Sequence, residues 1–139
     1  MTRRILAVVA GLAVWVAVVS VAGVIMRGAW GEYASVADAM TFTLPMMLAR
    51  LAIGALATLA AGWVTAVMAR RWILARLTVG LLLLVVFVPQ HIMLWDKFPA
   101  WYHLTFLASL VPLTCLGGNM TAARQAAGAV TGAIQGMPR

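Results

Sequence analysis

The sequence predicts an all-α integral membrane protein, an antiparallel four-helix bundle with both termini on the cytoplasmic side. Composition gives the first reason, because 65% of the 139 residues are hydrophobic and only 9% are charged. Soluble domains are about 45–50% apolar and about 25% charged. The second reason is that charged residues divide the chain into four apolar runs. Each run approaches the roughly 20 residues with which an α-helix crosses the hydrocarbon core of a bilayer.

The four runs predict membrane spans over residues 5–26, 48–68, 73–95 and 101–120. The loops between them are too short to form a soluble domain. We therefore expect one transmembrane domain over residues 1–120, with any functional site inside the bundle or at its rims. The remaining segment, residues 121–139, is rich in alanine, glycine and threonine, which predicts a flexible cytoplasmic tail.

Charge placement predicts the orientation of the bundle. One side of the threaded chain receives seven arginines, which are Arg3, Arg4, Arg70, Arg71, Arg76, Arg124 and Arg139. The other side receives Glu32, Asp38, Asp96 and Lys97. Basic residues concentrate in cytoplasmic loops, so the arginine-rich side is predicted to be cytoplasmic. Arg76 lies one turn inside that edge, where its long side chain can extend to the surface.

The N-terminal segment also has the pattern of a cleavable signal peptide, with two arginines, an apolar stretch and small residues. Its apolar run continues to Met26, however, so we expect a retained first span. The net charge of +7 is spread over separate segments rather than one basic face, which argues against a nucleic-acid partner. Anionic lipid headgroups attract such residues at about 1 kcal/mol each. The predicted partner is therefore the lipid bilayer.

The second span carries a packing motif. Small residues recur every fourth position at Gly54, Thr58, Gly62 and Ala66, which places them on one helix face. Such a face lets two helix backbones approach closely in a membrane. It could pack against another span of the same chain or form the seam of a homodimer.

Arg50 lies one helical turn before Gly54 and so belongs to the same face. A charged residue within a span is a functional candidate. Because it is close to the predicted outer edge, its side chain could instead extend to water or lipid phosphate. The alternative is an ion pair or an anion site inside the bundle, with Glu32, Asp38 or Asp96 as a partner.

The densest group of polar residues brackets the turn between the third and fourth spans. Pro89 removes a backbone donor and should kink the helix, and Gln90 and His91 follow it. Asp96 and Lys97 occupy the turn, and His103 opens the fourth span at about the depth of His91. Two histidines on adjacent helices could bind a metal, ligate haem or pass protons, or could be ordinary residues at headgroup level. No metal or phosphate-loop motif occurs, and the single Cys115 excludes an internal disulfide.

Two stretches carry a family resemblance. The second span ends A-G-W-V-T-A-V-M-A-R-R at residues 61–71, and the fourth runs from Trp101-Tyr102-His103 through Pro112 to Gly117-Gly118. Residues 48–118 thereby resemble small four-span bacterial inner-membrane proteins that have no settled activity. The resemblance implies a four-span topology and a bacterial inner-membrane location, and it transfers no catalytic residue.

Three classes of function remain open. The leading one is a non-enzymatic subunit, assembly factor or structural partner of a membrane complex, associating with itself or with other membrane subunits. The second is a small transporter or channel built by oligomerisation, with Arg50, Gln90 and His91 along its path. The third is a haem- or metal-binding redox protein that uses His91 and His103. No complete catalytic set is present, so an enzyme is the least favoured class.

Overall fold

The structure is a computed structural model that describes residues 2–69 and 72–135, with side chains as far as residue 120. Within these ranges the chain forms five α-helices and one short 3-10 helix, and no strand. In chain order they are α1 (Thr2–Ala29), α2 (Gly31–Val36), α3 (Leu44–Met68), α4 (Ile73–Met93), η1 (Trp95–Lys97) and α5 (Ala100–Gln135). The prediction of an all-α fold is confirmed.

Four helical segments are long and apolar enough to cross a membrane. They are α1, α3, α4 and the Ala100–Met120 part of α5, and their ends differ from the predicted ends by no more than about a helical turn. α3 begins earlier than predicted because Pro45 occupies its first turn, where no backbone donor is needed. The prediction of a multi-pass membrane protein is thus supported. The backbone of α5 stays helical to Gln135, although the glycines of this segment disfavour helix; the flexibility of the tail stays a prediction.

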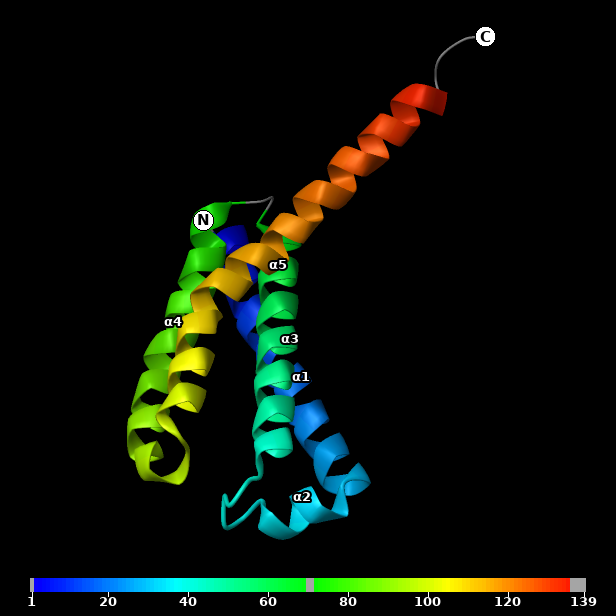
Figure 1. Cartoon of the computed structure of the whole chain (residues 1–139). Coiled ribbons are helices and arrows are strands. Elements are labelled where there is room, and N and C mark those ends of the chain that lie inside the picture. Colours follow the sequence, from blue (N-terminus) through cyan, green and yellow to red (C-terminus); the bar gives the residue numbers. More distant parts are fainter. Residues whose placement is uncertain (1, 70–71, 136–139) are drawn as a thin grey trace.

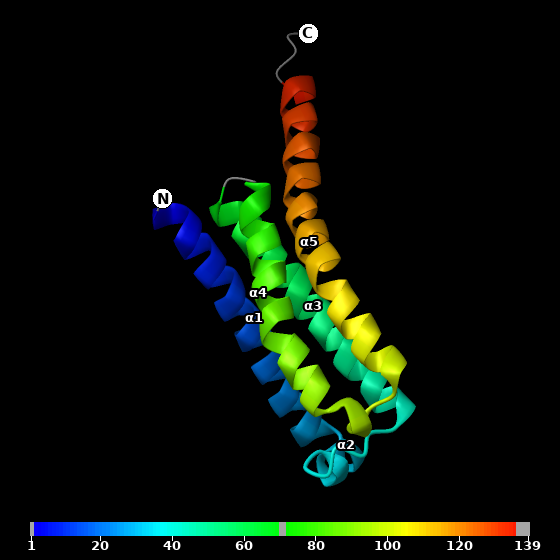
Figure 2. The same ribbon diagram turned by 90° about the vertical axis from the view of Figure 1, so that its left-hand side faces the viewer.

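The two ends of the molecule differ in what they carry. The start of α1 and the end of α5 lie at one end, and α2 and η1 lie at the other (Figures 1 and 2). We call these the N-terminal end and the α2 end. α3 packs mainly against α5 and α1, and α4 packs mainly against α5. α1 and α4 separate from each other toward the α2 end (Figure 1).

The small-residue face of α3 lies inside this arrangement. Gly54, Thr58, Gly62 and Ala66 are all buried. A Cβ atom on Gly62 would overlap the main chain of Thr114 in α5, so the two backbones are in direct contact there. Of the two possibilities open from the sequence, the structure has packing within the chain. Within the described chain, this face is covered by neighbouring helices; association between two copies stays a prediction.

Arg76 does not reach the surface as its position in the sequence suggests. The side chain is only 5% exposed, and its Nη1 donates to Asn119 Oδ1 at 2.8 Å and to the carbonyl of Cys115 at 3.2 Å. Gly118 has no side chain, and a Cβ there would overlap the arginine. The glycine thus gives the guanidinium space to lie across α5, where it ties the start of α4 to the end of the Ala100–Met120 span.

Candidate functional site

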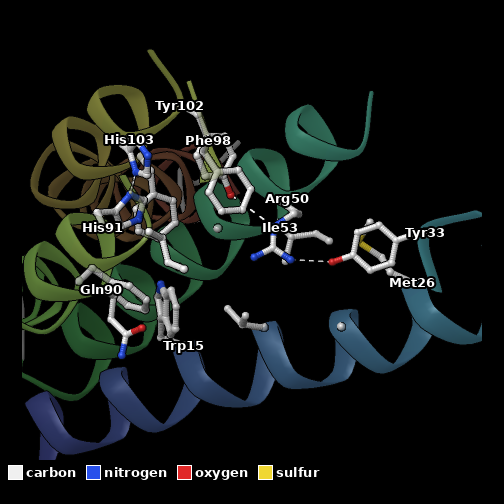
Figure 3. Close-up of a pocket in the computed structure, with 16 residues that line it drawn as sticks. Trp15, Met26, Tyr33, Arg50, Ile53, Gln90, His91, Phe98, Tyr102 and His103 are labelled. Carbon is white, nitrogen blue, oxygen red and sulfur yellow. Dashed lines mark hydrogen bonds between the residues drawn. The ribbon is translucent and has the colours of Figure 1, made fainter. Parts of the chain in front are cut away.

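A cavity of about 220 Å³ lies in the α2-end half of the bundle (Figure 3). All four spanning helices and α2 contribute to its wall. At about 30 Å³ per molecule in the liquid, this volume corresponds to about seven waters. The polar residues on the wall are Arg50, Gln90, His91, His103, Tyr33 and Tyr102. No aspartate or glutamate is among the described residues that line it.

Aromatic rings cover the cavity toward the α2 end. Tyr33 of α2 stacks on Phe42 with ring centroids 5.1 Å apart, and Phe42 stacks on Phe98 at 5.9 Å. Phe98 in turn stacks on Tyr102 of α5 at 4.8 Å. Tyr33, Phe98 and Tyr102 are each at most 8% exposed. We call these four rings the aromatic roof.

Three residues of the aromatic roof also contact Arg50. Its Nη1 donates to the Tyr33 hydroxyl at 2.7 Å and its Nε donates to the Tyr102 hydroxyl at 3.3 Å (Figure 3). Its Cζ lies 4.7 Å from the centroid of the Phe42 ring, within cation–π range. Arg50 therefore reaches into the bundle, not along the surface. Arg50 is among the residues that line the cavity.

None of the carboxylates that we expected as partners pairs with Arg50. Across the described side chains, the ion pair found is Arg27 with Asp38, at 3.3 Å. Glu32 and Asp96 are exposed, and neither shares an ion pair with Arg50. The guanidinium is thus held by neutral oxygens and a ring face. Its charge lacks a carboxylate counterion in the described part of the chain.

The two histidines, 12 positions apart, meet directly. The Nδ1 atoms of His91 and His103 are 2.7 Å apart, and the exposed fractions of these residues are 9% and 0%. Histidine nitrogens bind zinc at about 2.0–2.1 Å in tetrahedral geometry, so an ion held by these two atoms would set them about 3.3 Å apart. The observed separation is that of a hydrogen bond. The described residues also contain no group of three histidine, cysteine or acidic side chains that could hold a metal.

The hydrogen bond between the histidines favours one tautomer. His103 Nε2 is enclosed without a partner, and orphaned buried N–H groups are rarer than under-satisfied acceptors. An N–H on His103 Nδ1 that donates to His91 Nδ1 leaves the enclosed atom as a bare acceptor. His91 then carries its proton on Nε2. Because His91 lines the cavity, this places another donor beside Arg50.

The other polar candidates from the sequence separate into two groups. Gln90 lies on the cavity wall beside Trp15 and is also exposed at the protein surface (Figure 3). Pro89 precedes it within α4, which stays helical to Met93. Asp96 and Lys97 lie in η1, are exposed and do not line the cavity. The structure therefore brings Arg50, Gln90, His91 and His103 together and leaves the charged turn outside.

Sequence reasoning missed the floor of the site. Trp15 of α1 is buried, its Nε1 donates to Thr58 Oγ1 at 3.1 Å, and its ring lies 4.8 Å from that of Phe87. A signal was present, because Trp15 occurs in mid-span whereas membrane tryptophans gather at the interfaces. The roles of Tyr33 and Tyr102 as acceptors for Arg50 had no signal in spacing or motif.

Comparison of the chain with protein-family models, with curated proteins and with solved structures gives no match. The resemblance to small bacterial four-span proteins thus depends on the sequence motifs alone. The four apolar helices agree with the span number that it implies. A bacterial inner-membrane location stays a prediction.

Proposed function

We propose that this chain is a non-enzymatic multi-pass membrane protein that binds a small anionic group in the cavity beside Arg50. One observation carries the proposal: a guanidinium lies on the wall of a 220 Å³ cavity and has no carboxylate partner among the described residues. Taking an ion out of water costs several kcal/mol unless a counterion offsets it. A bound anion would supply that counterion.

Several polar groups on the wall can donate hydrogen bonds to an anion. An arginine fork binds carboxylate or phosphate through two parallel hydrogen bonds. Each tyrosine hydroxyl that accepts from Arg50 retains its own proton to donate. His91 Nε2–H and the N–H groups of the Gln90 amide are further donors among the residues that line the cavity. A cation would meet Arg50 and no acidic side chain.

For the topology, we propose an antiparallel bundle in a bacterial inner membrane with both termini cytoplasmic. The supporting feature is the distribution of charge, because Arg3, Arg4 and Arg76 lie toward the N-terminal end without an acidic residue. Arg27, Arg50 and Lys97 lie toward the α2 end, together with all three acidic residues of the chain, Glu32, Asp38 and Asp96. The rule that basic residues stay cytoplasmic then places the α2 end, with its cavity, on the outer side.

The other classes of function receive less support. A homo-oligomer or a subunit of a complex was favoured by the small-residue face of α3, and that face is occupied within the chain. A transport path through one chain would have to cross the core cluster that includes Trp15, Ala61 and Val79. Association with other subunits stays a prediction, which co-purification in mild detergent would test.

The proposal is tested by anion-dependent stability. Thermal unfolding of the protein in a non-ionic detergent is followed with increasing inorganic phosphate, against chloride at equal ionic strength. A ligand that binds only the folded state adds about 2.7 kcal/mol when present at 100 times its Kd. We expect phosphate to raise the Tm of the wild type and to leave the Tm of the Arg50→Gln variant unchanged.

Arg27→Gln is the matched control, because Arg27 lies at the same end and its side chain is 57% exposed. Its surface pair with Asp38 is worth about 1 kcal/mol or less, so phosphate should stabilise this variant as it does the wild type. An equal phosphate effect in Arg50→Gln and Arg27→Gln would refute the proposed site.

A further inference from the structure

The cavity reaches the protein surface between two membrane-spanning helices. Gly23 of α1 and Gln90 of α4 both line it, Gly23 is half-buried and Gln90 is exposed. No atom lies within 4 Å of the place where a Cβ on Gly23 would be. These two helices separate toward the α2 end (Figure 1). The opening beside Gly23 and Gln90 is therefore on the side of the bundle, where a spanning protein meets lipid.

Large side chains line the cavity in two other directions. The aromatic roof of Tyr33, Phe42, Phe98 and Tyr102 covers the cavity toward the α2 end. Trp15, bonded to Thr58 and packed on Phe87, closes it toward the bundle centre. A ligand that enters beside Gly23 and Gln90 reaches the cavity without moving these groups.

The depth of the site matches the region of lipid phosphates. Gly23 precedes the last residue of α1, Ala29, by six positions, or about 9 Å at 1.5 Å per residue. Arg50 follows the first residue of α3, Leu44, by the same number of positions. Headgroup layers add roughly 5–8 Å to each side of a hydrocarbon core about 30 Å thick. With the ends of α1 and α3 placed at the outer limit of the headgroup layer, both residues come to lie near the boundary between headgroups and acyl chains.

From the lateral opening, the closed roof and the depth of Arg50, we infer that the cavity binds the phosphate headgroup of an anionic phospholipid. The lipid enters between α1 and α4, and its acyl chains stay in the surrounding bilayer. This inference rests on the proposed function, since it names the anion that Arg50 binds. A phosphate offers oxygens to several donors at once, which fits a wall to which α3 contributes Arg50 and α4 contributes Gln90 and His91.

The experiment compares a phospholipid with a soluble phosphate ester that has no acyl chains. Dihexanoyl phosphatidylglycerol and glycerol 3-phosphate are titrated into the full chain in a non-ionic detergent, and Kd is obtained from the shift of Tm. We expect the short-chain lipid to bind about tenfold or more tightly than glycerol 3-phosphate. Arg50→Gln should abolish the binding of both.

Two glycines of α1 give a matched pair of variants for the entry route. Gly23→Leu places a side chain in the opening, and Gly28→Leu places the same side chain on α1 away from the cavity. Neither Cβ would meet another atom within 4 Å, and leucine favours helix over glycine, so both variants should fold. We expect Gly23→Leu to weaken lipid binding by about tenfold and Gly28→Leu to leave it unchanged.

The outcomes separate the inference from the function on which it rests. Equal Kd values for the lipid and for glycerol 3-phosphate would overturn the lipid assignment and leave the anion site standing. Equal lipid binding by Gly23→Leu and Gly28→Leu would overturn the lateral route. Absence of any Arg50-dependent binding, by lipid, glycerol 3-phosphate or inorganic phosphate, would overturn both.

Discussion

At the scale of single residues, Arg50 shows how a spanning helix can hold a guanidinium without a carboxylate. Two phenol oxygens accept its hydrogen bonds and the face of Phe42 attracts its charge. Carboxylates in these positions would neutralise the arginine and leave no reason for an anion to bind. Neutral acceptors fix the direction of the guanidinium while its charge stays available to the cavity.

The partners of Arg50 also mark a limit of sequence reasoning. The position of Arg50 on the small-residue face identifies it as a candidate from the sequence. Tyr33 and Tyr102 are 17 and 52 positions away, and no periodicity relates them to it. Their contact depends on where the α2 segment folds back over the bundle, which is a property of tertiary packing.

The histidine pair leads to a prediction at the same scale. Replacing only His103 by phenylalanine leaves His91 Nδ1 without its partner, and an unsatisfied buried group costs about 1–3 kcal/mol. Replacing both residues removes donor and acceptor together. We therefore expect the double variant His91→Phe/His103→Phe to lose less stability than the sum of the two single variants, with a coupling energy of about 0.6–2 kcal/mol. Equilibrium unfolding in mixed detergent micelles gives the unfolding free energies of the wild type, the two single variants and the double variant. Strictly additive losses of unfolding free energy would contradict a hydrogen bond between the two rings.

At the scale of elements, α3 packs in the bundle through its small-residue face. Its first turns contribute Arg50 to the cavity. Its four-residue repeat predicted a close helix contact from sequence, because that spacing depends only on helix geometry. The identity of the neighbour was not predictable, since α1 and α5 each offer small residues that fit. The structure shows both packed on α3, with Gly11 of α1 against Thr65 and Gly117 of α5 against Leu59.

A graded series of alanine substitutions tests this packing. A Cβ on Gly62 would overlap the main chain of Thr114, which cannot yield without moving α5. A Cβ on Gly54 would meet only the Phe106 ring, at 2.9 Å, and a side chain can rotate away. Overpacking costs typically about 1–3 kcal/mol, so we expect Gly62→Ala to lose at least that much and Gly54→Ala to lose less.

Gly28→Ala completes the series, because nothing lies within 4 Å of its Cβ position and alanine favours helix. Its unfolding free energy should equal or exceed that of the wild type. The comparison uses the same detergent unfolding measurement for all three variants. A larger loss for Gly54→Ala than for Gly62→Ala would show that α3 and α5 are not in backbone contact at Gly62.

At the scale of the whole molecule, composition and charge predicted most of the fold and little of the site. The bilayer determines how long an apolar span must be and where charged residues can interrupt it. Both features are therefore predictable from the order of residues in the sequence. The cavity depends instead on the divergence of α1 from α4 and on the roof of stacked rings. Both arise from contacts between segments far apart in sequence. α2, which positions Tyr33, is only six residues long and lies in a loop that hydropathy does not resolve.

The orientation of the molecule gives the last prediction, and it determines which leaflet supplies the proposed lipid. Replacing the single Cys115 by serine allows one cysteine to be placed at either end, as Ala39→Cys at the α2 end or Thr2→Cys at the N-terminal end. Both positions are exposed. If basic residues remain on the cytoplasmic side, a membrane-impermeant maleimide added to intact cells should label Ala39→Cys at once. Thr2→Cys should react only after the membrane is permeabilised. The reverse pattern would move the Arg50 cavity to the cytoplasmic leaflet, where it would still bind an anion but would draw its lipid from the opposite side of the bilayer.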